Sequence, residues 1–166
     1  MTTLDLAALR RDYALATLEE RDVDPDPIRQ FERWFADAVS AQVLEPNAMT
    51  LATATADGRP IVGPVDGIFY RGAFWFGSAP DSVRFRHIRA RPHVSATHLP
   101  GEELGVTVHG RAVPVDVSSG EFRQTLLEVY VPRYGPEWEK FLDSGPVYAR
   151  IEPERMFAFY FPVAAM

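Results

Sequence analysis

A concentrated run of basic residues follows two serines near the middle of this sequence. Between Arg84 and His93 the chain has four arginines, two histidines and no acidic residue, although the whole chain has 17 basic and 23 acidic residues and a net charge of −6. Ser78 stands at the expected end of a strand, and Ser82 at the expected start of a helix. A helix N-terminus, two hydroxyls and the Arg84 guanidinium are groups that bind phosphate, so this run predicts a phosphate site.

The same basic run also permits an interpretation without a ligand. Arginines on a solvated helix face can pair with the carboxylates of an acidic protein, and such surface pairs are common and weak. Residue types and spacing alone leave both interpretations open.

Other kinds of site find less support in the residues. The chain has no cysteine, which excludes disulfides, thiolate metal sites and cysteine nucleophiles. His87, His93, His98 and His109 show no pair four residues apart and no companion carboxylate motif, so we predict no metal site. The segment Phe76–Pro80 lacks the second glycine of the G-x-S-x-G motif, and a serine hydrolase is therefore not predicted.

Helical periodicity identifies the elements at the start of the chain. Residues 4–20 predict a short surface helix, and Asp26 followed by Pro27 predicts the start of a second one. The apolar stripe of that second helix, at steps of three and four residues, consists of Ile28, Phe31, Trp34, Phe35, Ala38 and Val39. Such a stripe packs against a large surface, either the chain's own sheet or a partner chain.

From residue 49 onward the pattern changes to strands. We predict strands at 49–55, 61–62, 68–70, 73–76, 94–99, 104–117, 147–151 and 156–161. Asp57-Gly58 predicts a hairpin turn, and a change of phase beyond Gly110 predicts a bulge. Helices are predicted at 81–90, after the capping-box spacing of Ser118–Glu121, and near 138–142.

This order of elements predicts the fold class and the domain organisation. About six short strands joined by hairpins, with helices at the start, in the middle and near the end, favour an α+β fold whose mostly antiparallel sheet closes as a small barrel. We expect a single domain over residues 1–166, with N-terminal helices in 1–45 and the barrel in 46–166.

Composition indicates the setting of the protein. An acidic chain is a poor general binder of nucleic acid, because that affinity comes from clustered cations. No apolar run approaches the roughly 20 residues that cross a bilayer, and Asp5 and Arg10 stand where a signal peptide has an apolar core. We therefore expect a cytoplasmic protein. Lys140 is the only lysine among 17 basic residues, which is typical of a high-G+C bacterial genome.

Several segments of the chain are similar, in order and with nearly the same gaps, to the pyridoxamine 5′-phosphate oxidase family. The similar segments are Leu9–Tyr13, Asp22, Asp26–Pro27, Phe31–Trp34, Glu45–Met49, Ala52–Thr53, Gly58–Pro60, Ser78, Ser82–Arg84 and Pro92–Ser95. The resemblance is good over roughly residues 9–99 and weaker beyond. It implies a six-stranded split β-barrel with flanking helices, forming a homodimer that binds FMN at the subunit interface.

The resemblance also implies roles for particular residues around the cofactor. Ser78 and Ser82 match hydroxyl residues near the flavin phosphate, and Arg84 takes the place of a phosphate-binding lysine. Phe159 falls near an aromatic position that packs beside the flavin. In the wider flavin and deazaflavin oxidoreductase group, a strand of small residues lets the ring lie against the backbone. The similar strand here contains Val62, Gly63, Pro64 and Val65.

The substrate half of the site departs from the family pattern. Arg10 and Tyr13 correspond to residues that reach over the substrate in the family. The segment Val62–Ile68, however, has neither of the two cations that the family carries there, and a flavin-contacting glutamine is replaced by Gly105 or its neighbour. No counterpart of the family's C-terminal Arg-Leu-His-x-Arg element precedes Met166. The residues therefore predict a small-molecule substrate without specifying which.

The activity implied by the resemblance is an FMN-dependent oxidoreductase that transfers a hydride at the flavin N5 atom. No catalytic side chain is predicted, because the cofactor carries out the difficult step. Two alternatives remain open: a deazaflavin-dependent reductase of the same fold, and a flavin- or haem-binding protein without turnover. Trp34, Trp75 and Trp138 are candidates to line a flavin pocket, although aromatic residues more often fill a core.

Overall fold

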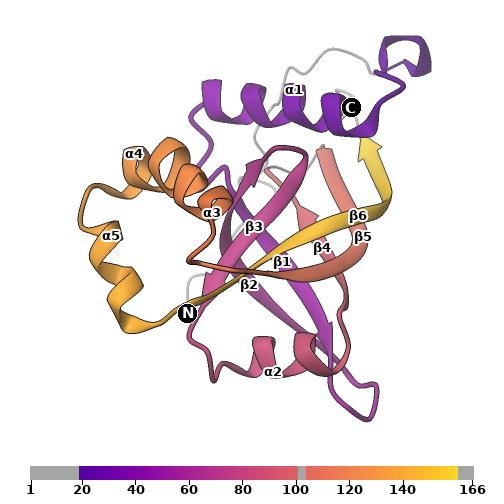
Figure 1. Ribbon diagram of the computed structural model, residues 1–166. Helices are drawn as coiled ribbons and strands as arrows, with labels where there is room; N and C mark the ends of the chain where they lie inside the picture. Colours follow the sequence, from indigo (N-terminus) through magenta and orange to yellow (C-terminus); the bar gives the residue numbers. More distant parts are fainter. Residues whose placement is uncertain (1–18, 101–103, 161–166) are drawn as a thin grey trace, which may run out of the picture.

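The computed structural model describes residues 19–100 and 104–160 (Figure 1). Six antiparallel strands close a barrel in the order β1-β2-β3-β6-β5-β4. The strands are β1 (Ala48–Ala54), β2 (Pro60–Tyr70), β3 (Ala73–Ser78), β4 (His93–His98), β5 (Leu104–Val115) and β6 (Val147–Tyr160). The helical elements are η2 (Glu20–Asp22), α1 (Pro27–Ser40), α2 (Val83–Ala90), α3 (Gly120–Thr125), η3 (Leu126–Tyr130), α4 (Val131–Tyr134), α5 (Trp138–Phe141) and η4 (Leu142–Ser144). The predicted α+β barrel is confirmed.

The two long helices begin at the predicted residues. The Asp26 side chain accepts a hydrogen bond from the backbone N–H of Ile28 at 2.9 Å, and α1 starts at Pro27. Ser82 caps α2, where its Oγ accepts from the backbone N–H of Phe85 at 3.4 Å. The helix predicted for residues 4–20 falls almost entirely outside the described residues. None of the helices in the described ranges is long and apolar enough to cross a membrane.

The predicted irregularities of the sheet are present where they depend on glycine. Gly58 has a φ of 90° in the turn between β1 and β2, a conformation that glycine adopts without steric cost. The register of β5 against β6 shifts between His109 and Gly110, which confirms the bulge. A Cβ on Gly110 would lie 2.2 Å from the carbonyl oxygen of Glu152, so the close approach of the two strands requires glycine there.

Two strands are longer than predicted. β2 runs unbroken through Gly63 and Pro64, and β6 is one strand, Val147–Tyr160. The N and O atoms of a strand residue point to the same edge, and the carbonyl of Pro64 accepts a hydrogen bond from Arg84 instead of from β1. The missing N–H of Pro64 therefore costs β2 no bond to β1. The N-cap of α3 is Ser119, one residue after the Ser118 with which the predicted capping-box spacing begins.

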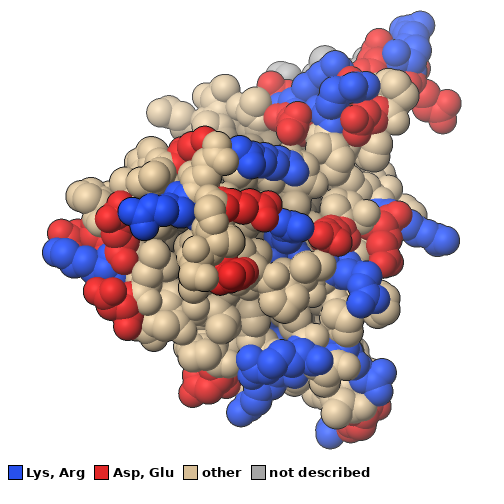
Figure 2. Space-filling model, in the orientation of Figure 1, with Lys and Arg blue, Asp and Glu red and all other residues tan. Residues whose placement is uncertain are grey.

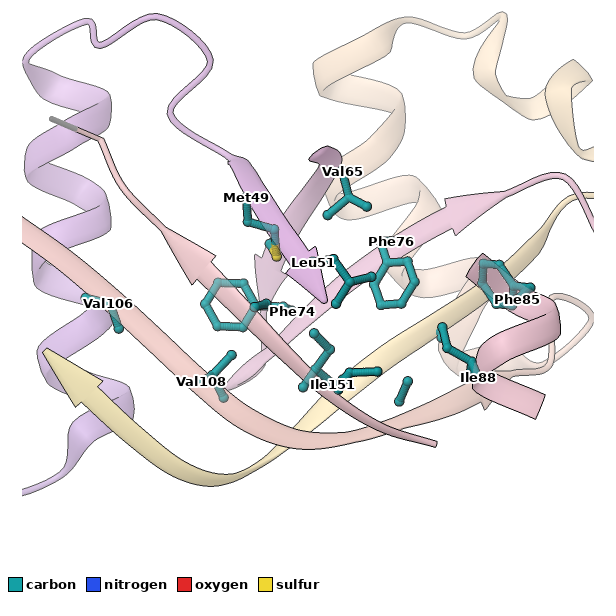
Figure 3. Close-up of a cluster of buried hydrophobic side chains, with 14 of the residues drawn as sticks. Met49, Leu51, Val65, Phe74, Phe76, Phe85, Ile88, Val106, Val108 and Ile151 are labelled. Carbon is teal, nitrogen blue, oxygen red and sulfur yellow. The ribbon is translucent and has the colours of Figure 1, made fainter. Parts of the chain in front are cut away.

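Large apolar side chains fill the barrel (Figure 3). Phe76 of β3 and Ile151 of β6 have no exposed surface, and Leu51 of β1 is buried in the same cluster. Phe85 and Ile88 enter this cluster from α2. Helix α2 therefore closes one end of the barrel and is held there by its apolar side, which leaves its arginines outside the core.

Helix α1 covers the other end of the barrel (Figure 1). The ring of Phe31 is buried and lies edge-on to Phe69 and Phe74, at centroid distances of 4.7 and 4.9 Å. Trp34 and Phe35 pack against the same cluster. The apolar stripe of α1 thus packs on the chain's own barrel, which answers the question that the sequence left open.

A helical segment, Gly120–Ser144, packs on the outer face of the barrel. Its side chains Phe122, Leu126 and Tyr130 form a second apolar cluster with Trp75 of β3 and Tyr148 of β6. This cluster holds α3, α4 and α5 beside the edges of β2, β3 and β6, where the cavity described below lies.

His98 is expected to make the fold sensitive to acid. The side chain is buried, its Nε2–H donates to the carbonyl oxygen of Pro46 at 2.5 Å, and burial lowers its pKa. Unfolding lets the imidazole take up a proton near its ordinary pKa of about 6.5, so the unfolded chain binds more protons below that pH. We therefore expect the free energy of unfolding to fall as the pH drops from 7.5 toward 5.

Urea denaturation at several pH values measures this effect. The variant His98→Gln should show a smaller decrease on acidification than the natural chain. His109→Gln, which changes an exposed histidine on β5, serves as the control and should keep the full decrease. The same pH dependence in all three proteins would contradict the assignment to His98.

Candidate functional site

Strands β2 and β3 separate after a short paired stretch. They pair only over Gly67–Tyr70 and Ala73–Phe76, and β3 then continues along β6. Asp66 and Gly77, the residues that would extend the pairing, instead line a cavity of about 240 Å³. The wall of the barrel is split at this point, and the cavity exposes the edge of β2 that β1 does not use.

Arg84 of α2 reaches into this split. One of its guanidinium nitrogens, Nη2, donates to the carbonyl oxygen of Pro64 at 2.9 Å, and partial burial lowers the pKa of Arg84. Within the described ranges, Arg84 has no carboxylate within ion-pair distance. A half-buried cation without an ion-pair partner is stabilised by a bound anion.

Arg89 of α2 and Arg91, the residue that follows the helix, also lack acidic partners in the described residues. Arg89 donates to the carbonyl oxygen of Pro80 at 3.1 Å, and Arg91 donates to that of Ala56 at 2.6 Å. In Figure 2, blue atoms gather at the lower edge of the molecule, where α2 lies in Figure 1. In the part of the chain that the structure describes, no salt bridge involves an arginine of α2. The structure thus does not show the paired basic face that was the alternative to a phosphate site.

Stacked aromatic rings form the opposite wall of the cavity. The rings of Tyr130 and Trp138 lie 5.7 Å apart and 3° from parallel, and Tyr134 stacks on Trp138 at 4.4 Å. Phe141 extends the stack at 5.0 Å from Trp138. Tyr130 comes from η3, Tyr134 from α4 and Trp138 and Phe141 from α5, and Tyr148 joins them from β6.

Three polar atoms of this aromatic wall are buried without a hydrogen-bond partner in the described part of the chain: the hydroxyls of Tyr130 and Tyr148 and the indole Nε1 of Trp138. Tyr130 is 3% exposed and Tyr148 is 2% exposed. Burial raises the pKa of the Tyr148 hydroxyl to about 12, an effect that the neighbouring Trp138 N–H opposes. Burial raises the pKa of Tyr130 as well. Both hydroxyls are therefore protonated at neutral pH.

A hydrogen-bond network joins α4 to β2 at the edge of the cavity. The hydroxyl of Tyr134 donates to Asp66 at 2.8 Å. Buried Asn47 donates to Asp66 and, at 2.8 Å, to the carbonyl oxygen of Gly67, and it accepts a hydrogen bond from Arg133. Two donors thus hold the Asp66 carboxylate, and the network fixes the aromatic wall over the strand.

Some of the predicted cofactor residues meet at this cavity. Pro64, Val65 and Arg84 line it. Gly63 lies next to them, since a Cβ on Gly63 would be 3.6 Å from Nη2 of Arg84. Val62, on the same strand, is 62% exposed.

Other predicted residues lie elsewhere in the chain. Ser78 pairs with Val147 at the end of β3, and Ser82 caps α2; neither lines the cavity. Phe159 is at the far end of β6, where its ring covers Gly105. Arg10 and Tyr13 lie outside the described residues. Of the three tryptophans, Trp138 lines the cavity, whereas Trp75 belongs to the second apolar cluster and Trp34 packs against the barrel core.

Sequence reasoning missed Tyr130, Tyr148 and Asp66 as parts of the site. Tyr130 and Tyr134 are four residues apart on consecutive helical segments, a spacing that places them on one helix face and was a usable signal. Trp138 follows the helix break at Gly135. Tyr148 and Asp66 reach the cavity only through the pairing of distant strands, and no local pattern marks them.

The chain is similar to known proteins both in sequence and in fold. The family described as "Pyridoxamine 5'-phosphate oxidase" matches residues 35–159. Curated relatives named pyridoxine/pyridoxamine 5′-phosphate oxidase include one from Paraburkholderia phymatum, 46% identical over 144 residues, covering 84% of this chain and 68% of the relative. One from Rubrobacter xylanophilus is 50% identical over 111 residues, covering 65% of this chain and 51% of the relative. The chain thus spans about half to two thirds of the length of these relatives.

Solved structures share the fold at lower sequence identity. PhzG from Burkholderia lata 383, solved in complex with tetrahydrophenazine-1-carboxylic acid, has a TM-score of 0.72 and 23% identity, covering 92% of this chain and 89% of PhzG. The heme storage protein HutZ from Vibrio cholerae has a TM-score of 0.62 and 19% identity, and the match covers 80% of this chain and 92% of HutZ. A structure described as an F420 reductase has a TM-score of 0.52 and 23% identity, and the match covers 70% of this chain and 94% of the reductase.

Proposed function

This chain belongs to the pyridoxamine 5′-phosphate oxidase family, and from that membership we propose that it is an oxidoreductase that binds FMN without a covalent bond in the split between β2 and β3. The observation that carries the proposal is the environment of the Arg84 side chain. Its guanidinium is half-buried, has no acidic partner in the described residues and lines a cavity of about 240 Å³. A phosphate group supplies the negative charge that this position lacks.

The residues around the cavity fit a flavin nucleotide. We assign the phosphate to Arg84 and to the turn between β3 and α2, where the Ser82 hydroxyl accepts from a backbone N–H but keeps its own hydrogen free to donate. Ser78 lies at the start of the same turn. We assign the backbone of Val62–Val65 to the isoalloxazine ring of FMN. This backbone lies on the edge of β2 that faces away from β1, and its small side chains permit the ring to approach closely.

The chemistry follows from this arrangement. When bound, FMN supplies a centre that accepts or donates a hydride. The chain supplies the Arg84 charge, the orientation set by β2 and α2, and an aromatic wall that excludes water. We assign no side chain of the described ranges as an acid or base, because the cofactor carries out the hydride transfer. The substrate is proposed to be a small molecule that reaches the ring from the solvent side.

We further propose that two copies of the chain associate through exposed apolar residues of the barrel. Phe157 and Phe159 of β6 are 52% and 48% exposed, which is unusual for large aromatic side chains. Size-exclusion chromatography with light scattering should give twice the monomer mass. The double variant Phe157→Asp, Phe159→Asp should elute as a monomer, and an unchanged dimer mass would contradict this interface.

A deazaflavin is the second candidate cofactor. A structure described as an F420 reductase shares the fold, and Arg89 and Arg91, which donate only to backbone carbonyls in the described residues, suit the acidic tail of such a cofactor. The protein as purified distinguishes the candidates through its absorption spectrum and through mass spectrometry of the molecule released on heating. Our proposal predicts a yellow protein that releases FMN. A colourless protein that binds added deazaflavin, or a bound flavin that no nicotinamide or substrate reduces, would favour the alternatives.

A further inference from the structure

Asp66 supplies a carboxylate to the cavity, and the function proposed above gives it no role. It lines the same cavity as Arg84. Pro64 and Asp66 lie on the same exposed face of β2, about 7 Å apart along the strand. No salt bridge involves Asp66 within residues 19–100 and 104–160. The cavity therefore has one unpaired charge of each sign, and only the positive one suits a phosphate.

Neutral groups hold the Asp66 carboxylate in a fixed orientation. The Tyr134 hydroxyl donates to Oδ2 at 2.8 Å, and the Asn47 amide donates to Oδ1. Arg133 does not neutralise the carboxylate, because it donates to Asn47 and pairs with Glu45 at 3.7 Å. An ionised carboxylate can accept about four hydrogen bonds, so each oxygen keeps an acceptor site. A fixed carboxylate with free acceptor sites is suited to bind a positively charged nitrogen.

The aromatic rings beside Asp66 favour the same kind of ligand. Tyr134, Trp138 and Phe141 line the cavity together with Asp66. The face of an aromatic ring carries partial negative charge and attracts cations. The wall already holds one cation in this way, since Cζ of Arg133 lies 5.2 Å from the centroid of the Tyr134 ring. Phe141 stands at the end of the stack and is 40% exposed, so a ligand can reach its ring.

We propose that Asp66 and Phe141 form the substrate subsite, and that the substrate is a small, flat molecule with a positively charged nitrogen and no anionic group. The proposal rests on the proposed function, because the subsite adjoins the β2 backbone assigned to the flavin ring. With the flavin phosphate on Arg84, Asp66 is the charge that a substrate meets. A cavity of about 240 Å³ requires a small ligand, since sites for drug-sized ligands measure roughly 300–1,000 Å³.

The test uses three probes that share one ring and differ in charge: benzylamine, benzyl alcohol and benzoate. Titration calorimetry at pH 7 measures their dissociation constants with the full chain in the presence of excess FMN, and the absorption spectrum reports whether FMN is bound. We expect benzylamine to bind about tenfold more tightly than benzyl alcohol, the usual difference for a charged hydrogen bond. Benzoate should bind most weakly of the three, because its charge has the sign of Asp66.

Three variants assign the preference to these residues. Asp66→Asn keeps the size and one oxygen acceptor but removes the charge, so benzylamine should bind about tenfold more weakly and benzyl alcohol unchanged. Asp143→Asn is the matched control, because Asp143 is exposed on η4 and does not line the cavity. It should keep the full preference. Phe141→Leu, a change at an exposed position, should reduce the preference for benzylamine about threefold.

The outcomes separate this inference from the proposed function. If the chain binds FMN but does not prefer benzylamine, or if Asp66→Asn keeps the preference, the subsite is wrong and the flavin assignment stands. If the chain binds no FMN but prefers benzylamine and loses that preference in Asp66→Asn, the cation subsite stands and the proposed function fails. A chain that binds neither FMN nor benzylamine overturns both.

Discussion

Replacing Arg84 with alanine should weaken FMN binding about 10- to 150-fold, which corresponds to about 1.5–3 kcal/mol for the loss of a charged hydrogen-bond donor. The effect is large because the guanidinium is half-buried beside the cavity and no carboxylate in the described ranges competes for it. Arg84→Lys keeps the charge but loses the planar pair of donors, so its loss should be smaller. Fluorescence titration with FMN measures both variants.

The matched control for this prediction is Arg86→Ala. Arg86 belongs to the same helix and carries the same charge, but it is exposed and does not line the cavity. Its removal should change FMN affinity by no more than the weak long-range attraction that salt screens. Equal losses in the two alanine variants would show that α2 acts only through its overall charge, and an unchanged affinity in Arg84→Ala would remove Arg84 from the site.

Replacing Phe31 with alanine should lower the free energy of unfolding by about 3–5 kcal/mol, the usual cost of truncating a buried phenylalanine. Phe31 is 1% exposed, and its ring contacts those of Phe69, Phe74 and His98. The loss removes the side chain and leaves a cavity between the helix and the barrel. Urea denaturation followed by circular dichroism measures the change.

Two comparisons make this second prediction specific. Val39→Ala, on the same helix but 49% exposed, should change the free energy of unfolding by less than about 0.5 kcal/mol. The loss in Phe31→Ala should also be independent of protein concentration, because Phe31 packs on its own barrel. A loss that disappears at high concentration would mean that α1 is held by a second chain.

The features that the sequence predicted correctly depend on neighbouring residues. Asp26 followed by Pro27 identifies the start of α1, because an N-cap and a fixed φ act within one turn of helix. Gly58 and Gly110 identify a turn and a bulge, because only glycine fits those backbone positions. The fold class followed from the order of such local signals.

The features that the sequence did not predict depend on distant pairing. Pro64 suggested a break in a strand, because proline has no N–H to donate to a neighbouring strand. The missing N–H costs no hydrogen bond here, since that edge of β2 faces Arg84, 20 residues away. The phosphate site was expected from Ser78, Ser82 and Arg84, and the structure adds a wall of aromatic residues that are brought to Arg84 by the divergence of β2 from β3. Such residues can be found only once the strand register is known.

The most direct test of the account is a crystal structure of the protein grown with excess FMN. We predict that the flavin lies along β2 in the split between β2 and β3, with its phosphate beside the turn between β3 and α2 and the phosphate oxygens about 3 Å from the guanidinium of Arg84. A phosphate exposed to solvent or bound at another surface, with Arg84 still bonded only to Pro64, would contradict the account.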